Sequence, residues 1–176
     1  MSNGYTMMLK AGLLLLAAVS FALFTSASVL AHGSKPHGSK ADDAGPVVKE
    51  QTLWGIAGDA ADVVRTVDVT MGDDMRFQPA SLRVKQGETI RFRVKNTGVL
   101  LHEFVIGTPE ENAKHAELML KFPGMEHDEP YMAHVDPGEV GEIVWTFNRE
   151  GTFEFACLIA GHFQAGMVGN ITVAAQ

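Results

Sequence analysis

The stretch SLRVKQGETIRFRVKNTG, residues 81–98, alternates apolar with polar or charged side chains on both sides of a short turn signal. Successive side chains of a β-strand point to opposite faces, so the pattern predicts two strands, each with one face in a core. The residues between them, KQGE (85–88), are typical of a turn, and we expect the two strands to form a hairpin. The apolar face carries Leu82, Val84, Ile90, Phe92 and Val94.

The same period of two recurs along the rest of the chain, in runs bounded by Gly, Asn or Pro. These runs are residues 65–71, 100–107, 141–147, 151–157 and 169–175. One segment differs, because PEENAKHAELMLKF (109–122) begins with Pro and acidic residues, which favour a helix N-terminus. The sequence therefore predicts an all-β sandwich of about seven strands with one short helix. A Met/His-rich loop is expected between the helix and the last three strands.

The first 31 residues are expected to lie outside this domain. Lys10 precedes an apolar run, residues 11–24, and Val29 and Ala31 occupy the −3 and −1 positions of a small-residue cleavage site. This is the pattern of a signal peptide, which implies export. The alternative is an uncleaved membrane anchor, since the whole apolar stretch has about the 20 residues that span a bilayer.

Residues 32–51 are rich in Gly, Ser, Pro and charge, and they predict a flexible lead before a domain at 52–176. The chain has a formal net charge of −7 at pH 7. A charge of this sign argues against binding to nucleic acid or anionic lipid, so membrane contact is expected only if the signal segment is uncleaved.

The single cysteine, Cys157, lies in FEFACLIAGHFQAGMVGNITV, residues 153–173. It shares a strand face with two phenylalanines that must point into the core, so its sulfur is expected to point inward as well. His162 and Met167 follow on glycine-containing loops and can turn back over the end of the strand. Two His and one Cys with a weak axial Met form the blue-copper electron-transfer site. His102, at the start of the strand in GVLLHEFVIG, is the candidate for the second histidine.

These residues resemble the cupredoxins, the small type 1 copper proteins. The likeness covers residues 63–174 and consists of FQPASLRVKQGETIRFRVKNTG, then HEF, then a Cys-x4-His-x4-Met loop. It implies a Greek-key β-sandwich that binds Cu(I)/Cu(II) through His102, Cys157, His162 and the axial ligand Met167. The loop spacing is similar to that of rusticyanin. The helix and the Met/His-rich loop resemble periplasmic copper-tolerance cupredoxins, which implies a periplasmic location.

Other readings of the cysteine explain fewer of its neighbours. Taken alone, Cys157 would be an inert core residue, and His162 and Met167 would be an ordinary loop histidine and core filler. A Cys–His hydrolase would leave Met167 without a role. Structural zinc uses more than one Cys or closely spaced His, and a dinuclear copper centre needs two thiolates. We therefore expect a copper-binding protein and not an enzyme.

A second set of histidines and methionines lies outside this constellation. Imidazoles and thioethers are what a copper-capturing surface would display. The alternative is that the methionines cover the edge of the core and that the histidines are ordinary loop residues. The repeated Met-x-His units at 125–127 and 132–134 are expected in a loop that cannot easily bury them. The candidate accessory ligands are His32, His37, His115, Met119, Met125, His127, Met132 and His134.

Two functions remain open at this stage. In the first, the protein binds and redox-cycles copper in periplasmic copper tolerance, and the accessory residues capture the ion. In the second, it carries single electrons between respiratory partners. A redox partner would dock near His162, where Phe163 contributes apolar surface.

Overall fold

The computed structural model describes residues 49–125 and 127–175. The signal peptide predicted over residues 1–31, nearly all of the predicted lead and the candidate ligands His32 and His37 lie outside these residues. The division into residues 1–31, 32–51 and 52–176 therefore stays a prediction. Within the described residues, no helix has the length and apolar character needed to cross a membrane.

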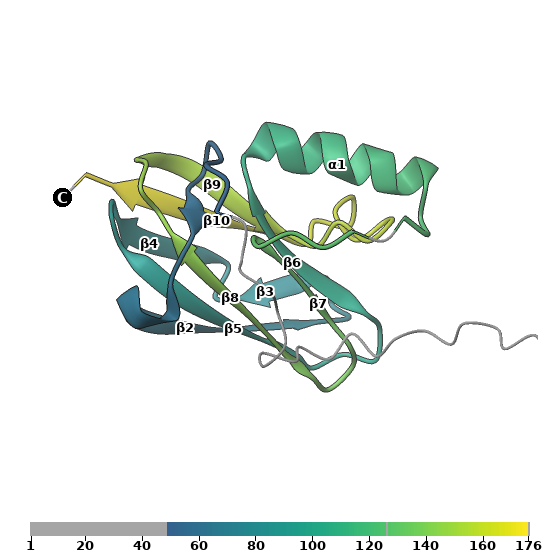
Figure 1. The fold of residues 1–176 in the computed structure, drawn as a ribbon. Coiled ribbons are helices and arrows are strands. Elements are labelled where there is room, and N and C mark those ends of the chain that lie inside the picture. The colour runs from purple at the N-terminus through teal and green to yellow at the C-terminus, as the bar shows by residue number, and fades with distance from the viewer. Residues whose placement is uncertain (1–48, 126, 176) are drawn as a thin grey trace, which may run out of the picture. The chain divides into compact units, whose positions relative to one another are not determined.

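Two five-stranded sheets make up the described domain (Figure 1). The first has the order β1–β8–β5–β2–β3 and consists of β1 (Ile56–Ala57), β2 (Val63–Gly72), β3 (Arg76–Gln78), β5 (Thr89–Asn96) and β8 (Val140–Thr146). The second has the order β4–β10–β9–β6–β7 and consists of β4 (Ser81–Lys85), β6 (His102–Gly107), β7 (Met132–Val135), β9 (Gly151–Ala156) and β10 (Val168–Ala174). A 3-10 turn, Ala60–Asp62, precedes β2. The predicted all-β sandwich is confirmed.

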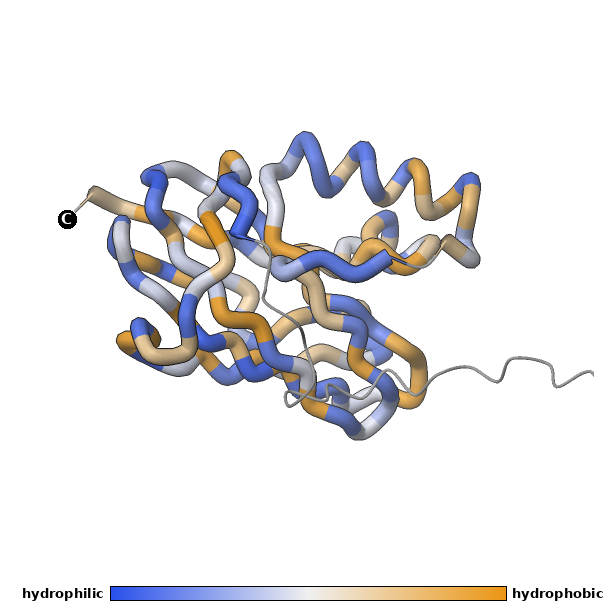
Figure 2. The backbone as a smooth tube through the Cα atoms, viewed as in Figure 1, coloured by the Kyte–Doolittle hydropathy of each residue, from blue (hydrophilic) through white to orange (hydrophobic). Residues whose placement is uncertain are grey.

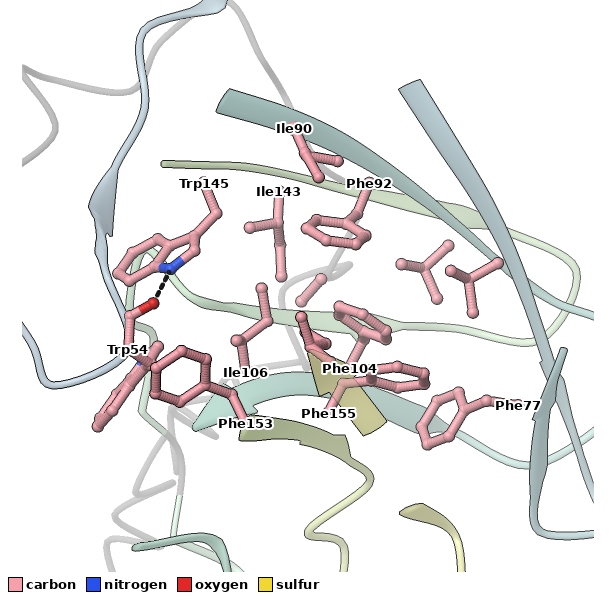
Figure 3. Close-up of a cluster of buried hydrophobic side chains, with 14 of the residues drawn as sticks. Trp54, Phe77, Ile90, Phe92, Phe104, Ile106, Ile143, Trp145, Phe153 and Phe155 are labelled. Carbon is pink, nitrogen blue, oxygen red and sulfur yellow. Dashed lines mark hydrogen bonds between the residues drawn. The ribbon is translucent and has the colours of Figure 1, made fainter. Parts of the chain in front are cut away.

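The core lies between the inner faces of the two sheets. Apolar and polar residues alternate along the strands, as the hydropathy colouring shows (Figure 2). Figure 3 shows Ile90, Phe92, Ile143 and Trp145 of the first sheet opposite Phe104, Ile106, Phe153 and Phe155 of the second. Phe155 stacks on Phe104 with ring centroids 4.9 Å apart and meets Phe77 edge-on at 5.1 Å. Aromatic contacts therefore join the strands that carry the candidate ligands to the rest of the core.

The hairpin expected from residues 81–98 is wrong. β4 pairs in parallel with β10 in the second sheet, whereas β5 pairs with β2 and β8 in the first. The turn at residues 86–88 therefore carries the chain from one sheet to the other. The alternation was ambiguous because two strands that face each other across a sandwich bury the same apolar pattern as two strands paired in a hairpin.

The helix forms where the sequence predicted it, as α1 (Pro109–Lys121). The hydroxyl of Thr108 accepts a hydrogen bond from the backbone N–H of Glu111 at 3.1 Å, and Pro109 stands in the first turn. α1 packs on β6 and β9 and covers the outer side of the second sheet (Figure 1). Ala116 and Met119 are among the residues of α1 that are buried.

Part of the expected Met/His-rich loop is a strand, because residues 132–135 form β7 and pair with β6. The expectation that this segment could not bury its side chains is wrong, since Met132 is only 5% exposed and His134 is half-buried. The backbone of β6 and the cover of α1 supply the burial that a free loop would lack.

Gly169 of β10 lies against the ring of Phe155 on the neighbouring strand β9, so a substitution at Gly169 tests how tightly this part of the core is packed. A Cβ atom at this position would overlap the buried ring of Phe155, which neighbouring aromatic rings hold in place. Gly169→Ala is expected to lower the free energy of unfolding by about 1–3 kcal/mol. Gly124→Ala is the matched control, because nothing lies within 4 Å of its added Cβ, and it should change stability by less than about 0.5 kcal/mol. Urea unfolding of both variants measures the difference, and equal midpoints would contradict the packing argument.

Candidate metal centre

The predicted cysteine and both predicted histidines meet at one end of the second sheet, at its interior strands β6 and β9. His102 opens β6, Cys157 follows directly after β9, and His162 lies in the loop between β9 and β10. β6 and β9 are antiparallel neighbours, so the start of one strand lies beside the end of the other. Each residue offers one ligand atom, and these atoms all lie within 4.8 Å of one another.

The loop after β9 is folded back on itself by backbone hydrogen bonds. The N–H of Cys157 donates to the carbonyl of Met167 at 3.1 Å, and the N–H of Met167 donates to the carbonyl of His162 at 3.1 Å. Gly161 and Gly166 adopt φ angles of +93° and +87°, a region that side chains disfavour and glycine permits. The loop thereby brings His162 and the fully buried Met167 back to the cysteine.

Cys157 is completely buried, as the alternation of β9 predicted. Its Sγ lies 3.2 Å from Nδ1 of His162 and 4.0 Å from Nδ1 of His102. It also accepts a hydrogen bond of 3.3 Å from the backbone N–H of Glu103. Burial raises the pKa of the thiol to about 12, so in the metal-free protein it is protonated at neutral pH. A metal that binds here must displace that proton, because the thiolate is the ligand.

An aspartate that sequence reasoning missed stands behind His102. Nε2 of the buried His102 ring lies 3.0 Å from Oδ1 of Asp73, while Nδ1 faces the cysteine. Hydrogen bonds from the backbone N–H of Val99 and from His102 lower the pKa of Asp73, with a smaller effect from the N–H of Leu100. A carboxylate on the far nitrogen fixes the orientation of a metal-binding imidazole. Asp73 lies in a turn with no ligand-like spacing, so no signal in the sequence marks it.

His162 is the least buried residue of the cluster. Its ring centroid lies 4.9 Å from that of His102. Burial lowers the pKa of His162, and the nearby His102 lowers it further, so the ring is neutral at neutral pH and keeps a lone pair for a metal. Phe163 was expected to be part of a docking surface. It is half-buried and packs against the apolar side chains under α1, which include Val105 and Leu158. Val99 and Leu100, whose backbone N–H groups donate to Asp73 behind His102, are apolar residues exposed at 81% and 46%.

A second carboxylate, on Glu103, lies on the outer side of the sheet, and sequence reasoning missed it as well. Its side chain is only 4% exposed. One oxygen lies 2.9 Å from Nε2 of His134, its cross-strand neighbour, and the other accepts a hydrogen bond from the N–H of Leu158 at 3.3 Å. Glu103 thus contacts the cysteine through its backbone and the residue after the cysteine through its side chain.

The accessory candidates divide into two groups. Met119 and Met132 are both buried, and Met132 packs in an apolar cluster with Val105 and Ala116, which agrees with the alternative that they are core residues. His115, His127 and His134 form a row, with ring centroids 4.5 Å and 6.2 Å apart. Burial lowers the pKa of His115, the neighbouring His127 lowers it further, and the Glu103 carboxylate opposes this shift. Met125 lines a surface pocket together with His115 and His127.

The donor set of the main cluster fits copper. A thiol sulfur and two imidazole nitrogens face one another, and a methionine on the same loop is held beside them. Oxygen donors, which Mg²⁺ and Ca²⁺ require, are absent from this described cluster, because Asp73 is engaged with the far side of His102.

Comparisons with known proteins agree with this reading. A model of the copper-binding proteins of the plastocyanin/azurin family matches residues 63–174. The chain is 49% identical over 142 residues to the copper-resistant cuproprotein CopI of Rubrivivax gelatinosus, with 81% of this chain and 82% of that protein covered. The identity to the copper-resistant cuproprotein CopI of Pseudomonas aeruginosa is 38% over 149 residues, covering 68% and 82%. Among solved structures, dithionite-reduced auracyanin of Roseiflexus castenholzii matches with a TM-score of 0.55 and 25% identity, over 64% of this chain and 98% of that one.

The raised pKa of Cys157 predicts an unusual pH dependence of thiol reactivity. Only the thiolate reacts with iodoacetamide, and a thiol with a pKa of about 12 stays protonated up to high pH. The alkylation rate of the metal-free protein is therefore expected to rise about tenfold per pH unit between pH 8 and 10. The same chain unfolded in guanidinium serves as the control and should level off near the ordinary thiol pKa of about 8.5. A folded-state rate that levels off below pH 9 would contradict the burial argument.

Proposed function

The chain belongs to the plastocyanin/azurin family of copper-binding proteins, and on this premise we propose that it is an exported copper-resistance protein with one type 1 copper site. His102, Cys157, His162 and the axial Met167 are the proposed ligands. The observation that carries the proposal is the convergence of one buried thiol and two imidazoles within 4.8 Å at the end of a core strand. Resistance is supported by the two relatives named copper-resistant cuproproteins.

Bound copper supplies a one-electron couple between Cu(I) and Cu(II). The chain's own residues hold the ligands still during that change, because β6 and β9 fix His102 and the start of the ligand loop. Asp73 orients the imidazole of His102, and the N–H of Glu103 donates to the sulfur, where it stabilises a thiolate. The buried Phe155 and Leu158 exclude water. These features support redox cycling without rearrangement of the site, and no catalytic group for a substrate is proposed.

Electrons are proposed to pass through the edge of His162, the half-buried ligand. A redox partner would then dock over His162 and the exposed apolar side chains of Val99 and Leu100. This surface favours a second candidate function, that of a one-electron carrier between respiratory partners. For either function the N-terminal segment is proposed to direct the protein to the periplasm.

A Cu(II) titration of the metal-free protein tests the type 1 site. An intense visible thiolate-to-copper band is expected to saturate at one equivalent, and Cys157→Ala should abolish it because the only thiol is lost. Met167→Leu should keep an intense band at a shifted wavelength, since the axial ligand is weak. Circular dichroism confirms that both variants fold. A coloured band that survives in Cys157→Ala would refute the assignment of the thiolate.

Growth of cells that lack the gene separates the two functions. Wild-type protein supplied on a plasmid is expected to restore growth in copper-containing medium, whereas Cys157→Ala should not. Immunoblots of the periplasmic fraction check that both forms are exported in equal amounts. If Cys157→Ala restores growth fully, resistance does not depend on the type 1 site. If loss of the gene slows respiration but leaves copper tolerance unchanged, the carrier function holds instead.

A further inference from the structure

The turn between β2 and β3, residues 73–75, is bordered by two side chains that contact the metal centre from different directions. Within the turn, the carboxylate of Asp73 lies 3.0 Å from Nε2 of His102. Directly after the turn, Arg76 opens β3 and reaches the ligand loop, residues 157–167. The same short hairpin therefore holds both the strand-borne histidine and the loop that carries the other ligands.

Arg76 binds the ligand loop at the point where the axial ligand follows. Its Nη1 atom donates hydrogen bonds to the carbonyls of Ala165 at 3.1 Å and Gly166 at 3.4 Å. Residues 160–166 form successive turns, and these two carbonyls belong to the last residues of that run. A basic side chain can bind the carbonyls at the end of such a run. The guanidinium thus fixes the backbone immediately before Met167.

The positive charge of Arg76 has no acidic partner. Among the ion pairs of the described residues none includes Arg76. Its third hydrogen bond goes to the carbonyl of Met75 in its own turn, at 2.7 Å. Arginine is well suited to binding carboxylates in pairs of hydrogen bonds, yet here it joins the carbonyls of one loop to those of another. Its main contact is therefore the one that holds the ligand loop against the hairpin.

The backbone of the hairpin keeps Arg76 in this place. Met75 adopts a φ angle of +58°, a left-handed conformation that glycine normally supplies in a three-residue hairpin turn. Its side chain packs against the core, and its N–H donates to the carbonyl of Gly72 at 3.0 Å. The N–H of Arg76 donates to Oδ1 of Asp74 at 3.2 Å. These contacts hold a backbone conformation that costs free energy, which is typical of segments that serve a functional site.

We propose that Arg76 is a positioning residue for the axial ligand. By holding the two carbonyls before Met167, it sets how closely the thioether approaches the copper. The weak axial ligand tunes the potential of a blue-copper site, so a shift of this loop would change the redox couple while β6 and β9 keep His102 and Cys157 in place. The inference deepens the proposed function and rests on its assignment of Met167 as the axial ligand.

Hydrogen exchange in the metal-free protein tests the contact without relying on copper. The amide of Met167 donates to the carbonyl of His162, and the amide of Cys157 donates to that of Met167, both at 3.1 Å, so their exchange reports opening of the loop. Arg76→Gln is expected to speed the exchange of both about three- to tenfold, because the hydrogen bonds it loses are charged but exposed to solvent.

Arg93→Gln is the matched control for the loss of one positive charge. Arg93 pairs with Asp68 on β2 and not with the ligand loop, so both amides should exchange as in the wild type. An Arg76→Gln variant whose loop amides exchange at the wild-type rate would overturn the proposal. An equal increase at every core amide would overturn it too, since Arg76 would then stabilise the whole domain and not the loop.

The copper-loaded protein supplies the second readout. Arg76→Gln is expected to shift the visible thiolate-to-copper band, and Arg76→Lys, which keeps the charge and three donors, should shift it less. In a Met167→Leu background Arg76→Gln should cause no further shift of the band, because the ligand through which Arg76 acts is gone. The change in midpoint potential is likewise expected to be smaller in that background.

A band shift of the same size with and without Met167 would contradict the positioning role, because the charge of Arg76 would then act alone. A wild-type protein that forms no visible band would instead refute the type 1 site, whereas the exchange rates of the metal-free protein do not depend on that site. Failure of this inference and failure of the proposed function therefore give different results.

Discussion

The antiparallel pairing of β6 with β9 is the constraint on which the metal centre depends. The register places Val105 opposite Ala156 and Ile106 opposite Phe155. A slip of one residue would turn every side chain of a strand to the other face, and the stacked rings of Phe104 and Phe155 oppose such a slip by filling the core. In the same register Cys157 follows directly after Ala156 and its Sγ comes within 4.0 Å of Nδ1 of His102, so the energy of core packing also positions the ligands.

Burial makes the site a neutral one before a metal arrives. Burial in the core raises the pKa of the Cys157 thiol and keeps it protonated, and partial burial lowers the pKa of His162 and keeps its ring uncharged. Two carboxylates remain close by, Asp73 behind His102 and Glu103 beside the cysteine loop. The negative charge of these two carboxylates offsets the positive charge of a metal ion that binds. Among the ligand side chains, only the thiol of Cys157 must lose a proton. The metal-free domain can therefore fold with the ligands already in place.

The sequence predicted seven of the ten strands that the described residues form, the helix and the Cys157–Met167 loop, because these depend on local periodicity and spacing, but it missed β1, β3 and β7. The convergence of His102 with this loop was expected because a blue-copper site needs a second histidine, and not because of local spacing. The sequence did not predict which strands pair. β4 and β5 follow one another with a turn between them, and only packing against the opposite sheet decides that they separate. The same limit explains the missed carboxylates, because Asp73 reaches His102 from a distant turn and Glu103 gains its role when β7 and the cysteine loop fold against β6.

The strand β7 also changes how the Met/His-rich segment should be understood. As a free loop, it would display all its donors to solvent, and capture would be unselective. In the folded domain Met132 is buried, His134 is tied to Glu103, and His127 and Met125 remain at the pocket beside α1. Folding thus withdraws some donors and concentrates others opposite His115. The two ring nitrogens of His127 are covered without a hydrogen-bond partner, which costs free energy, so the pairing of β7 with β6 and the cover of α1 must offset that cost for the segment to fold as it does.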